Sequence, residues 1–308
     1  MSTAIRVASV NWNYGGIDAD GSDARWHQTV EALRRARPQV VLCQELGVPQ
    51  PALRQSRHVR RTANALEMEP VLGPVVPAAR SALHTAILVD THTTGWRIVD
   101  DGPYPGTDPS TAHAWCMVEL HIPGLDRPLC CFSVHFPARS AVAQLSQAQY
   151  LGALVALRPQ LALIGGDFNC YPRGGPSVTA DELERLPRHL QVTRCRQDPQ
   201  GRPEANYDVD DTFARAGLID IAAHLPPTRR DPPHLRPTGR GGARVDRVYG
   251  SPELATAATL YRHITTGSDH DALVLDLDLV CVADAPPVAT APTPAVPRAT
   301  PTPITSTS

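Results

Sequence analysis

The sequence predicts an α/β (α+β) protein in which β-sheets are covered by helices. One observation supports this fold class, and two others define which part of the chain is folded and exclude a membrane span. Aliphatic runs of buried type alternate along the chain with segments of helical spacing. No apolar run approaches the ~20 residues that a membrane span needs. The chain ends in a Pro/Thr/Ala/Ser-rich stretch with almost no charge. We expect residues 1–282 to form one large domain and residues 283–308 to form a disordered tail.

The first half of the domain is expected to hold most of the strands. Aliphatic residues at positions 5–10 indicate a strand, and apolar residues in helical spacing indicate a helix over residues 26–37. Pro38 ends that helix, because a proline disfavours helical backbone in the residue before it. Further strand patterns follow at residues 40–43, 81–89, 96–99, 114–121 and 129–136.

The second half continues the alternation. The Pro/Arg/Gly-rich residues 226–242 lie between strong motifs, so we expect a long surface loop there. The expected elements are a helix over about residues 142–157, a buried strand from residue 161, a short helix over residues 211–216, and strands over residues 244–249 and 272–279.

Composition narrows the class of protein. The 29 basic and 31 acidic residues give a net charge of −2, and every basic residue is arginine, so charge argues neither for nor against a nucleic-acid partner. An odd number of cysteines without C-x-x-C spacing predicts reduced thiols instead of a disulfide framework or zinc site. With no secretory signal or membrane span in the pattern, we expect a cytoplasmic monomer. The cysteines are Cys43, Cys116, Cys130, Cys131, Cys170, Cys195 and Cys281.

The segment from residue 161 to residue 169 combines a buried strand with two polar side chains. Aliphatic residues lead into Gly165 and Gly166, which we expect to let the backbone turn tightly at the strand end. Asp167 and Asn169 are two residues apart in an extended segment and so face one cleft. A carboxylate beside an amide can hold and orient a water molecule. An ordinary Asx turn explains this segment alone equally well.

Polar residues recur at the ends of the predicted strands. Any one of them is explained by a cap, a turn or a satisfied core histidine, but open sheets build their sites from strand ends, so the recurrence predicts a site. The six strand ends are Asn11 with Asn13, Glu45, His135, Asp167 with Asn169, Asp246, and Asp269 with His270.

Five of these segments, in order along the chain, resemble the endonuclease/exonuclease/phosphatase superfamily, which includes AP endonucleases, deoxyribonucleases, inositol polyphosphate 5-phosphatases and sphingomyelinases. The resemblance spans residues 4 to about 280 and implies a four-layer sandwich of two packed mixed β-sheets flanked by helices, with the active site at one edge. The matching segments are Ser9-Val10-Asn11-Trp12-Asn13, Val41-Leu42-Cys43-Gln44-Glu45, Gly166-Asp167-Phe168-Asn169, Arg244-Val245-Asp246 and Ser268-Asp269-His270.

The resemblance also implies a role for each residue at the metal and the water. Glu45 would be the principal ligand of a divalent metal, Mg²⁺ with Mn²⁺ as an alternative, because oxygen ligands suit Mg²⁺. Asn11 would support that metal or the phosphate, and Asp269 would be a further carboxylate for the metal or for the histidine. Asp167 would deprotonate the attacking water while Asn169 orients the water or a phosphate oxygen.

The remaining residues bear on the phosphate. His270 would stabilise the charge of the transition state, and Asp246 would hold its ring in the charged form. His135 stands where AP endonucleases carry a tyrosine, which makes a specialised abasic-site enzyme less expected and leaves His135 to donate to phosphate. Asn13 would contact phosphate too, although some members carry an aspartate at its position, which weakens the case for a second metal site.

Three function classes follow from these residues. The first is a metal-dependent phosphodiesterase acting on DNA or RNA, which is slightly favoured. The second is a phosphatase or phosphodiesterase for a small metabolite or a lipid headgroup, with a closed pocket that the loop over residues 226–242 would roof. The third is a non-catalytic binding module on the same fold. The presence of every polar residue of the resemblance argues against the third class.

Overall fold

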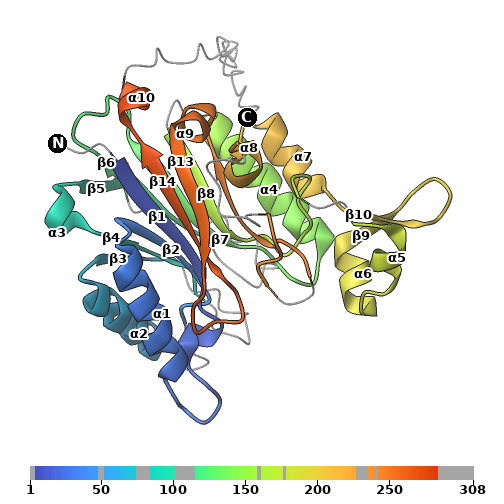
Figure 1. Ribbon diagram of the computed structural model, residues 1–308, viewed down its shortest axis with the longest axis horizontal. Helices are drawn as coiled ribbons and strands as arrows, with labels where there is room; N and C mark the ends of the chain where they lie inside the picture. The colour runs from blue at the N-terminus through green and yellow to red at the C-terminus, as the bar shows by residue number, and fades with distance from the viewer. Residues whose placement is uncertain are drawn as a thin grey trace, which may run out of the picture.

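The computed structural model describes residues 4–47, 52–73, 84–100, 115–157, 161–175, 178–226, 235–239 and 242–283. Two six-stranded mixed sheets dominate it (Figure 1). The first sheet has the strand order β13-β14-β1-β2-β4-β3, with bounds β13 Ala258–Ile264, β14 Ala272–Asp278, β1 Ala4–Asn11, β2 Val40–Gln44, β4 Ala86–Val89 and β3 Glu69–Leu72. The second has the order β11-β12-β8-β7-β6-β5, with bounds β11 Ile219–Asp220, β12 Asp246–Gly250, β8 Leu161–Asp167, β7 Leu129–His135, β6 Cys116–His121 and β5 Arg97–Asp100.

The two sheets pack face to face because alternate residues of each strand point to opposite sides. Val7 and Leu42 of the first sheet share one buried core with Cys131 and Leu163 of the second. The next residue along β1, Ala8, belongs instead to the core between the first sheet and its helices. This alternation buries both faces of each sheet.

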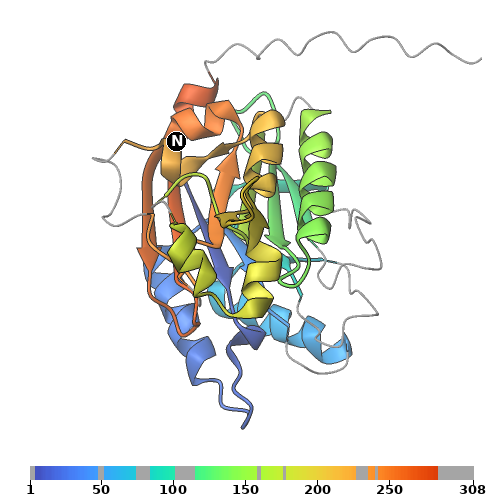
Figure 2. The ribbon, with the colours of Figure 1, turned by 90° about the vertical axis from the view of Figure 1, so that its right-hand side faces the viewer.

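Helices cover the outer face of each sheet and complete four layers, which confirms the predicted sandwich. In the first sheet's outer core, Trp26 and Leu33 of α1 (Ala24–Ala36) pack with Val59 of α2 (Ala52–Leu66). On the second sheet, Leu151 of α4 (Ala141–Ala156) and Phe213 of α7 (Asp208–Arg215) do the same. Figure 1 shows the two pairs on opposite sides, and Figure 2 shows α4 and α7 in front of the second sheet.

A small lobe follows β8 and has its own apolar cluster. It consists of two short helices and a two-stranded sheet, and it projects at the right of Figure 1. Tyr171, Leu183 and Ala205 pack there with Ala243 and Val245, which lead into β12. The lobe is therefore anchored directly beside the ends of β8 and β12. Its elements are α5 Ala180–Glu184, α6 Arg188–Arg194, β9 Cys195–Gln197 and β10 Pro203–Ala205.

The remaining elements are short. The 3-10 turn η1 follows β1, α3 precedes β5, and α8 to α10 connect or follow the last strands. Their bounds are η1 Tyr14–Gly16, α3 Thr91–Thr94, α8 Ile221–His224, α9 Pro252–Ala257 and α10 Val280–Ala283. No helix in the described part of the chain has the length and apolar character needed to cross a membrane.

Two glycines predicted to form a turn lie inside a strand, so that prediction was wrong. Gly165 and Gly166 are part of β8, which runs on to Asp167. A Cβ on Gly165 would stand 2.6 Å from Leu42 Cδ1 of the facing sheet, and one on Gly166 would stand 1.8 Å from the Val134 carbonyl oxygen. The glycines therefore permit close approach of neighbouring backbone and side chains.

Other differences concern the ends and number of elements. The short helix expected over residues 211–216 begins earlier and is α7, and the strand expected over residues 244–249 is β12. The sequence patterns missed α2, β3, β13 and the helices of the lobe. Residues 81–83, most of the loop over residues 226–242, and the tail beyond Ala283 lie outside the described residues, so those predictions stay predictions. All seven cysteines are free thiols, as predicted.

Candidate active site

Strand register aligns three of the predicted residues across the second sheet. In the parallel pair β7–β8, His135 lies opposite Asp167. In the antiparallel pair β8–β12, Asp167 lies opposite Asp246. Neighbouring strands are about 4.8 Å apart, so the three residues are adjacent across the sheet. We call His135, Asp167 and Asp246 the strand-end row.

The first sheet ends beside this row. Asn11 pairs with Gln44 in the parallel register of β1 and β2, and Glu45 follows immediately. Two buried hydrogen bonds tie this end to the second sheet: Gln44 Nε2 donates to Ser133 Oγ at 3.0 Å, and Ser133 Oγ donates to the Cys43 carbonyl at 2.8 Å. Because side chains from both sheets share these bonds, Glu45 is held next to the row.

Two carboxylate oxygens converge where the sheets meet. Asn11 Nδ2 donates to Glu45 Oε1 at 3.3 Å and to Asp167 Oδ2 at 3.2 Å. His135 Nε2 lies 3.7 Å from each of the same two oxygens. Glu45 Oε1 and Asp167 Oδ2 therefore share two nitrogen neighbours, and their combined negative charge makes this point attractive to a cation.

Backbone in the left-handed region aims the side chains on either side of this point. Glu45 and Asn169 both have φ of 51°, which costs a non-glycine residue about 1 kcal/mol. The backbone N–H of Tyr14 donates to Glu45 Oε2 at 3.3 Å, and that of Asn169 donates to Asp167 Oδ1 at 2.8 Å. Asn169 Nδ2 donates to the Phe136 carbonyl at 3.0 Å. These bonds compensate the strain and orient both carboxylates.

A histidine–carboxylate pair closes the other end of the row. His270 Nδ1 and Asp246 Oδ2 are 2.7 Å apart. Both side chains are largely buried, with 12% and 3% of their surfaces exposed. The backbone N–H of Asp246 donates to Thr238 Oγ1 at 2.9 Å, which fixes the residue at the start of β12. The geometry is that of a charge-assisted hydrogen bond.

The charges around the His270 ring keep it protonated. Burial lowers the pKa of His270, but the charge and hydrogen bond of Asp246, together with the charges of Asp167 and Asp269, outweigh burial and raise this pKa to about 10. Burial raises the pKa of Asp246 as well, although the His270 charge opposes that rise. At neutral pH the pair therefore retains its proton, and the ring can donate from Nε2.

A segment that the sequence interpretation overlooked packs on the histidine. A Cβ on Gly239 would lie 2.6 Å from His270 Cε1, so only glycine lets the backbone approach the ring this closely. The neighbouring Thr238 accepts from Asp246 and, through its carbonyl, from the Asp271 backbone at 3.0 Å. A lone Thr-Gly pair in a proline- and arginine-rich stretch carries no sequence signal for this role.

Two predicted residues lie at the margin of the site. Asn13 is half-exposed in left-handed backbone with φ of 48°, and its N–H donates to Asn11 Oδ1 at 3.0 Å. Asp269 is half-buried beside His270 and accepts from Ser268 Oγ at 3.4 Å. The charge of Asp269 thus helps to keep His270 protonated. The predicted metal ligation by Asp269 and the predicted phosphate contact of Asn13 stay predictions.

The donor set near Glu45 fits a hard divalent cation. Carboxylate oxygens of Glu45 and Asp167 converge there, and Mg²⁺ and Mn²⁺ prefer oxygen ligands. Asp167, Asp246 and His270 also offer atoms within 4.8 Å of one another. A protonated ring paired with a carboxylate has no free lone pair for a metal, so the Glu45 side suits the cation better. Asn11 contributes by bridging the two carboxylates.

Comparison with known proteins agrees with this fold. The model of the endonuclease/exonuclease/phosphatase family matches residues 10–270. The chain belongs to this family. Members of the endonuclease/exonuclease/phosphatase family are phosphoesterase hydrolases and generally use a divalent metal. None of the curated proteins matches the chain.

Solved structures of the endonuclease/exonuclease/phosphatase fold span nearly the whole chain. A humanized TDP2 from D. rerio has a TM-score of 0.59 at 15% identity and covers 89% of this chain and 99% of its own. An AP endonuclease from Archaeoglobus fulgidus has a TM-score of 0.55 at 14% identity, covering 89% and 99%. A mannosyl-6-phosphatase from Bacteroides thetaiotaomicron has a TM-score of 0.55 at 15% identity, covering 88% and 98%. At such identities these similarities establish the fold alone.

Proposed function

We propose that this protein is a phosphodiesterase that depends on a divalent metal, Mg²⁺ or Mn²⁺, and hydrolyses its substrate with an activated water molecule. One observation carries the proposal. A single row of strand ends holds a cluster of carboxylate oxygens at one end and a protonated histidine at the other. Hydrolysis of a phosphate ester needs both groups. A base takes the proton of the attacking water, and hydrogen-bond donors stabilise the negative charge that develops on the phosphate oxygens in the transition state.

Asp167 is the proposed base. Its Oδ1 accepts from the Asn169 backbone, which fixes the carboxylate, and its Oδ2 faces the Asn11 amide. A water held between this carboxylate and the Asn169 side chain would lose its proton to Asp167 as it attacks the phosphorus. Asn169 keeps its orientation because its own amide is bound to the Phe136 carbonyl.

His270 and His135 are the proposed phosphate contacts. His270 is cationic at neutral pH and directs Nε2 away from Asp246, so it can donate to a phosphate oxygen that gains charge in the transition state. His135 lies on the other side of Asp167 in the strand-end row and can donate to a second oxygen or to the leaving group. Asp246 holds the His270 ring and its proton.

Glu45, with Asn11 beside it, is the proposed holder of the metal, and Asp269 is a candidate further ligand. A divalent cation there would polarise the phosphoryl oxygen and stabilise the departing oxyanion. Without a cation, the carboxylates of Glu45 and Asp167 repel each other and the phosphate. Metal binding is therefore expected to be required for substrate binding as well as for turnover.

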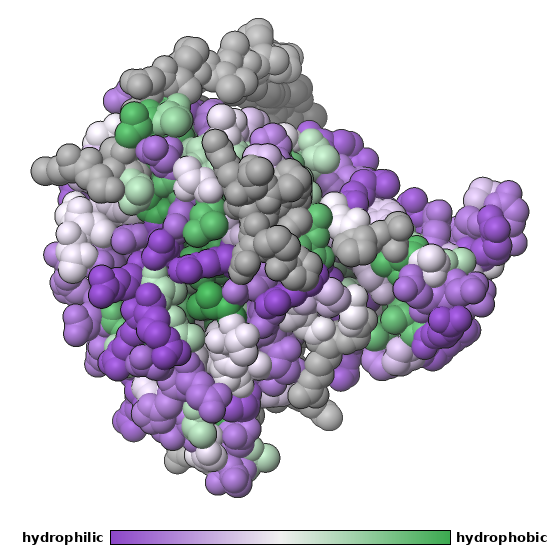
Figure 3. Space-filling model, viewed as in Figure 1, coloured by the Kyte–Doolittle hydropathy of each residue, from purple (hydrophilic) through white to green (hydrophobic). Residues whose placement is uncertain are grey.

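A nucleic-acid substrate is favoured by exposed side chains that follow the strands of the site in the sequence. Tyr14 is 44% exposed although its backbone bonds to Glu45, and Arg139 is exposed just after β7. An exposed aromatic ring and a cation beside a phosphate site are the groups that grip a nucleic-acid strand. On the face that Figure 3 shows, the coloured residues are mostly hydrophilic and the hydrophobic areas are small and separate.

A small-molecule phosphatase is the alternative. The net charge of −2 provides no broad basic surface for nucleic acid, and one similar structure is named a mannosyl-6-phosphatase. The two functions differ in the bond that is cut. A phosphomonoesterase releases inorganic phosphate from sugar or nucleoside monophosphates, whereas a phosphodiesterase cleaves internucleotide bonds and leaves monoesters intact.

The test compares substrate classes under identical metal conditions. Purified protein is assayed with Mg²⁺, Mn²⁺ or EDTA on plasmid DNA, single-stranded RNA, a phosphodiester reporter and sugar phosphates. We expect turnover of a phosphodiester with metal, none with EDTA, and a weaker Kd for single strands in Tyr14→Ala. Turnover confined to monoesters would overturn the proposal and identify the protein as a phosphatase. If no ester were hydrolysed, the protein would be a binding module without catalytic activity.

A further inference from the structure

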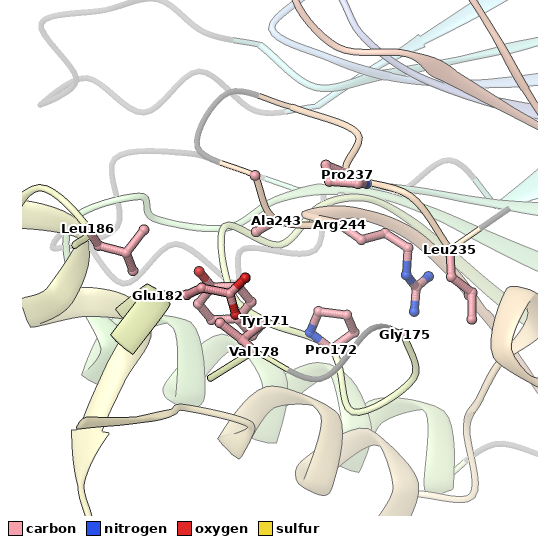
Figure 4. A pocket seen from close by; sticks show the side chains of 11 residues that line it. Tyr171, Pro172, Gly175, Val178, Glu182, Leu186, Leu235, Pro237, Ala243 and Arg244 are labelled. Atoms are coloured by element: carbon pink, nitrogen blue, oxygen red, sulfur yellow. The ribbon is translucent and has the colours of Figure 1, made fainter. Parts of the chain in front are cut away.

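A separate cavity lies between the small lobe and the chain that enters β12. Its volume is about 260 Å³, and Figure 4 shows its side chains, which come from three parts of the chain. It is smaller than the roughly 300–1,000 Å³ of pockets that enclose a whole drug-sized ligand. A fragment such as one ring system fits this volume. The lining includes Tyr171, Pro172, Val178, Leu186, Leu235 and Pro237.

The cavity is next to the strand-end row on the β12 side. Tyr171 is two residues beyond Asn169, so its Cα lies within about 7 Å of that residue's Cα. Ala243, also in the lining, is three residues before Asp246, and Pro237 is two residues before Gly239, which touches the His270 ring. The cavity wall is therefore built by the same segments of the chain that carry Asn169, Gly239 and Asp246.

Most described residues of the lining are apolar, and the one cation among them, Arg244, is already neutralised. Arg244 is 97% buried on the cavity wall, where its guanidinium is bonded to Asp220 and its Nη2 also donates to the Gly174 carbonyl at 2.7 Å. The remaining charged group, Glu182, is exposed and negative. Among the described residues of the lining, a phosphate or a polyhydroxylated sugar would find no free cation and few partners, so this lining suits a neutral group.

Two polar groups stand at the edge of this apolar space. Burial raises the pKa of the Tyr171 hydroxyl, which keeps its proton and can donate. Oε2 of the Glu182 carboxylate accepts hydrogen bonds from the backbone N–H and the hydroxyl of Thr179, and as an anion the carboxylate can accept further bonds. A flat ring with acceptors and an amino group on its edge matches this arrangement, whereas an acyl chain would need a longer space and no polar edge.

We propose that this cavity binds one nucleobase of the substrate, that of the nucleotide adjoining the scissile phosphate. The proposal rests on the proposed phosphodiesterase function and names its substrate class. The prolines provide apolar faces against which the base packs, and the edge of the base meets the Tyr171 hydroxyl and Glu182. Arg139 lies beyond β7 at the opposite end of the row, so the strand would cross the row from the cavity toward Arg139.

The first experiment measures binding without catalysis. Adenosine, ribose and phenol are titrated separately into the metal-free protein and followed by NMR chemical shifts. We expect adenosine to bind at least tenfold tighter than ribose or phenol, the scale of one or two hydrogen bonds to the edge of the base. Leu186→Trp, which fills the cavity from a half-exposed position, and Tyr171→Ala, which removes its ring, should each weaken adenosine at least fivefold. Val192→Trp on the exposed face of the same lobe is the matched control and should change nothing.

The second experiment measures selectivity in turnover. A dinucleotide and the same molecule lacking one base are hydrolysed by wild type and by Leu186→Trp, and the ratio of the two kcat/KM values should collapse toward one in the variant. Adenosine binding that is absent, weaker than phenol binding, or unchanged in both variants would overturn the nucleobase assignment even if the protein cleaves phosphodiesters. Adenosine binding lost in both variants would support it even if no ester is hydrolysed, in which case the proposed function alone fails.

Discussion

Replacing Asp246 with asparagine should convert the His270 ring from a cation at neutral pH into a group that titrates near neutrality. The substitution keeps the size of the side chain and its backbone bond to Thr238 but removes the charge 2.7 Å from His270 Nδ1. The pKa of His270 is about 10 with that charge in place and should fall toward the ordinary value of 6.5 without it. Activity that needs the protonated ring then acquires a new pH dependence.

The expected loss follows from the two pKa values. At pH 8 the ring is about 99% protonated with a pKa near 10 and about 3% protonated with a pKa near 6.5, so kcat/KM should fall roughly thirtyfold. At pH 6 the same variant should lose less than about twofold, because most of its rings carry a proton again. The loss at pH 8 should therefore be almost entirely recovered by acidification.

The assay is the pH profile of kcat/KM from pH 5.5 to 9 on the best phosphodiester substrate at saturating metal. Asp276→Asn is the matched control, because Asp276 is also ion-paired, with Arg6 at 2.6 Å, but lies farther along β14 from the site. It should leave the profile unchanged. A loss in Asp246→Asn that is the same at pH 6 and pH 8 would refute the assignment of a protonated His270, and would leave Asp246 with a purely structural role.

Three further predictions concern stability. Because the pKa of His270 is raised to about 10 in the folded protein, its pairing with Asp246 stabilises the fold fully below pH 6.5, and this stabilisation disappears as pH rises from 6.5 to about 10. In urea denaturation with EDTA, the wild type should therefore lose a few kcal/mol of unfolding free energy over that pH range, whereas His270→Gln should not. Gly166→Ala places a methyl group 1.8 Å from the Val134 carbonyl oxygen and should lower Tm by roughly 6–12 °C, a cost of about 3 kcal/mol. The control Gly124→Ala also has positive φ but nothing within 4 Å, so it should lower Tm by only a few degrees; equal shifts would contradict the packing argument. Arg247→Leu removes a fully buried guanidinium that lies 3.9 Å from Asp210 and donates to the Cys170 and Arg244 carbonyls, so it should cost about 3–5 kcal/mol in urea denaturation; a neutral result would show that the charge is dispensable.

Much of the fold was predictable because the central strands are buried on both faces. Continuous aliphatic runs such as those of β2 and β8 have few other interpretations. The helix α2 was missed because its buried face mixes His58 and Thr62 with Val59 and Ala63, so the hydrophobic period is interrupted. The edge strand β13 is half-exposed, so polar residues interrupt its apolar pattern as well.

The site was predictable to the extent that it consists of strand ends. Glu45 follows β2, Asp167 ends β8 and Asp246 begins β12, and register then fixes which strand ends meet. The bond across the sheets through Ser133 and the approach of Gly239 to the histidine depend on tertiary contacts between segments far apart in sequence. Neither residue type signals such a contact locally, so sequence patterns could not reveal them.

The central claim is that the strand-end row hydrolyses a phosphodiester with a divalent metal. The most direct measurement is the turnover of a phosphodiester reporter and of plasmid DNA by wild type, Asp167→Asn and Glu45→Gln across a titration of Mg²⁺ or Mn²⁺. We expect wild-type activity that requires metal, at least a hundredfold loss in Asp167→Asn at every metal concentration, and a loss in Glu45→Gln that is greatest at low metal. Full activity in EDTA, or in Asp167→Asn, would contradict the account.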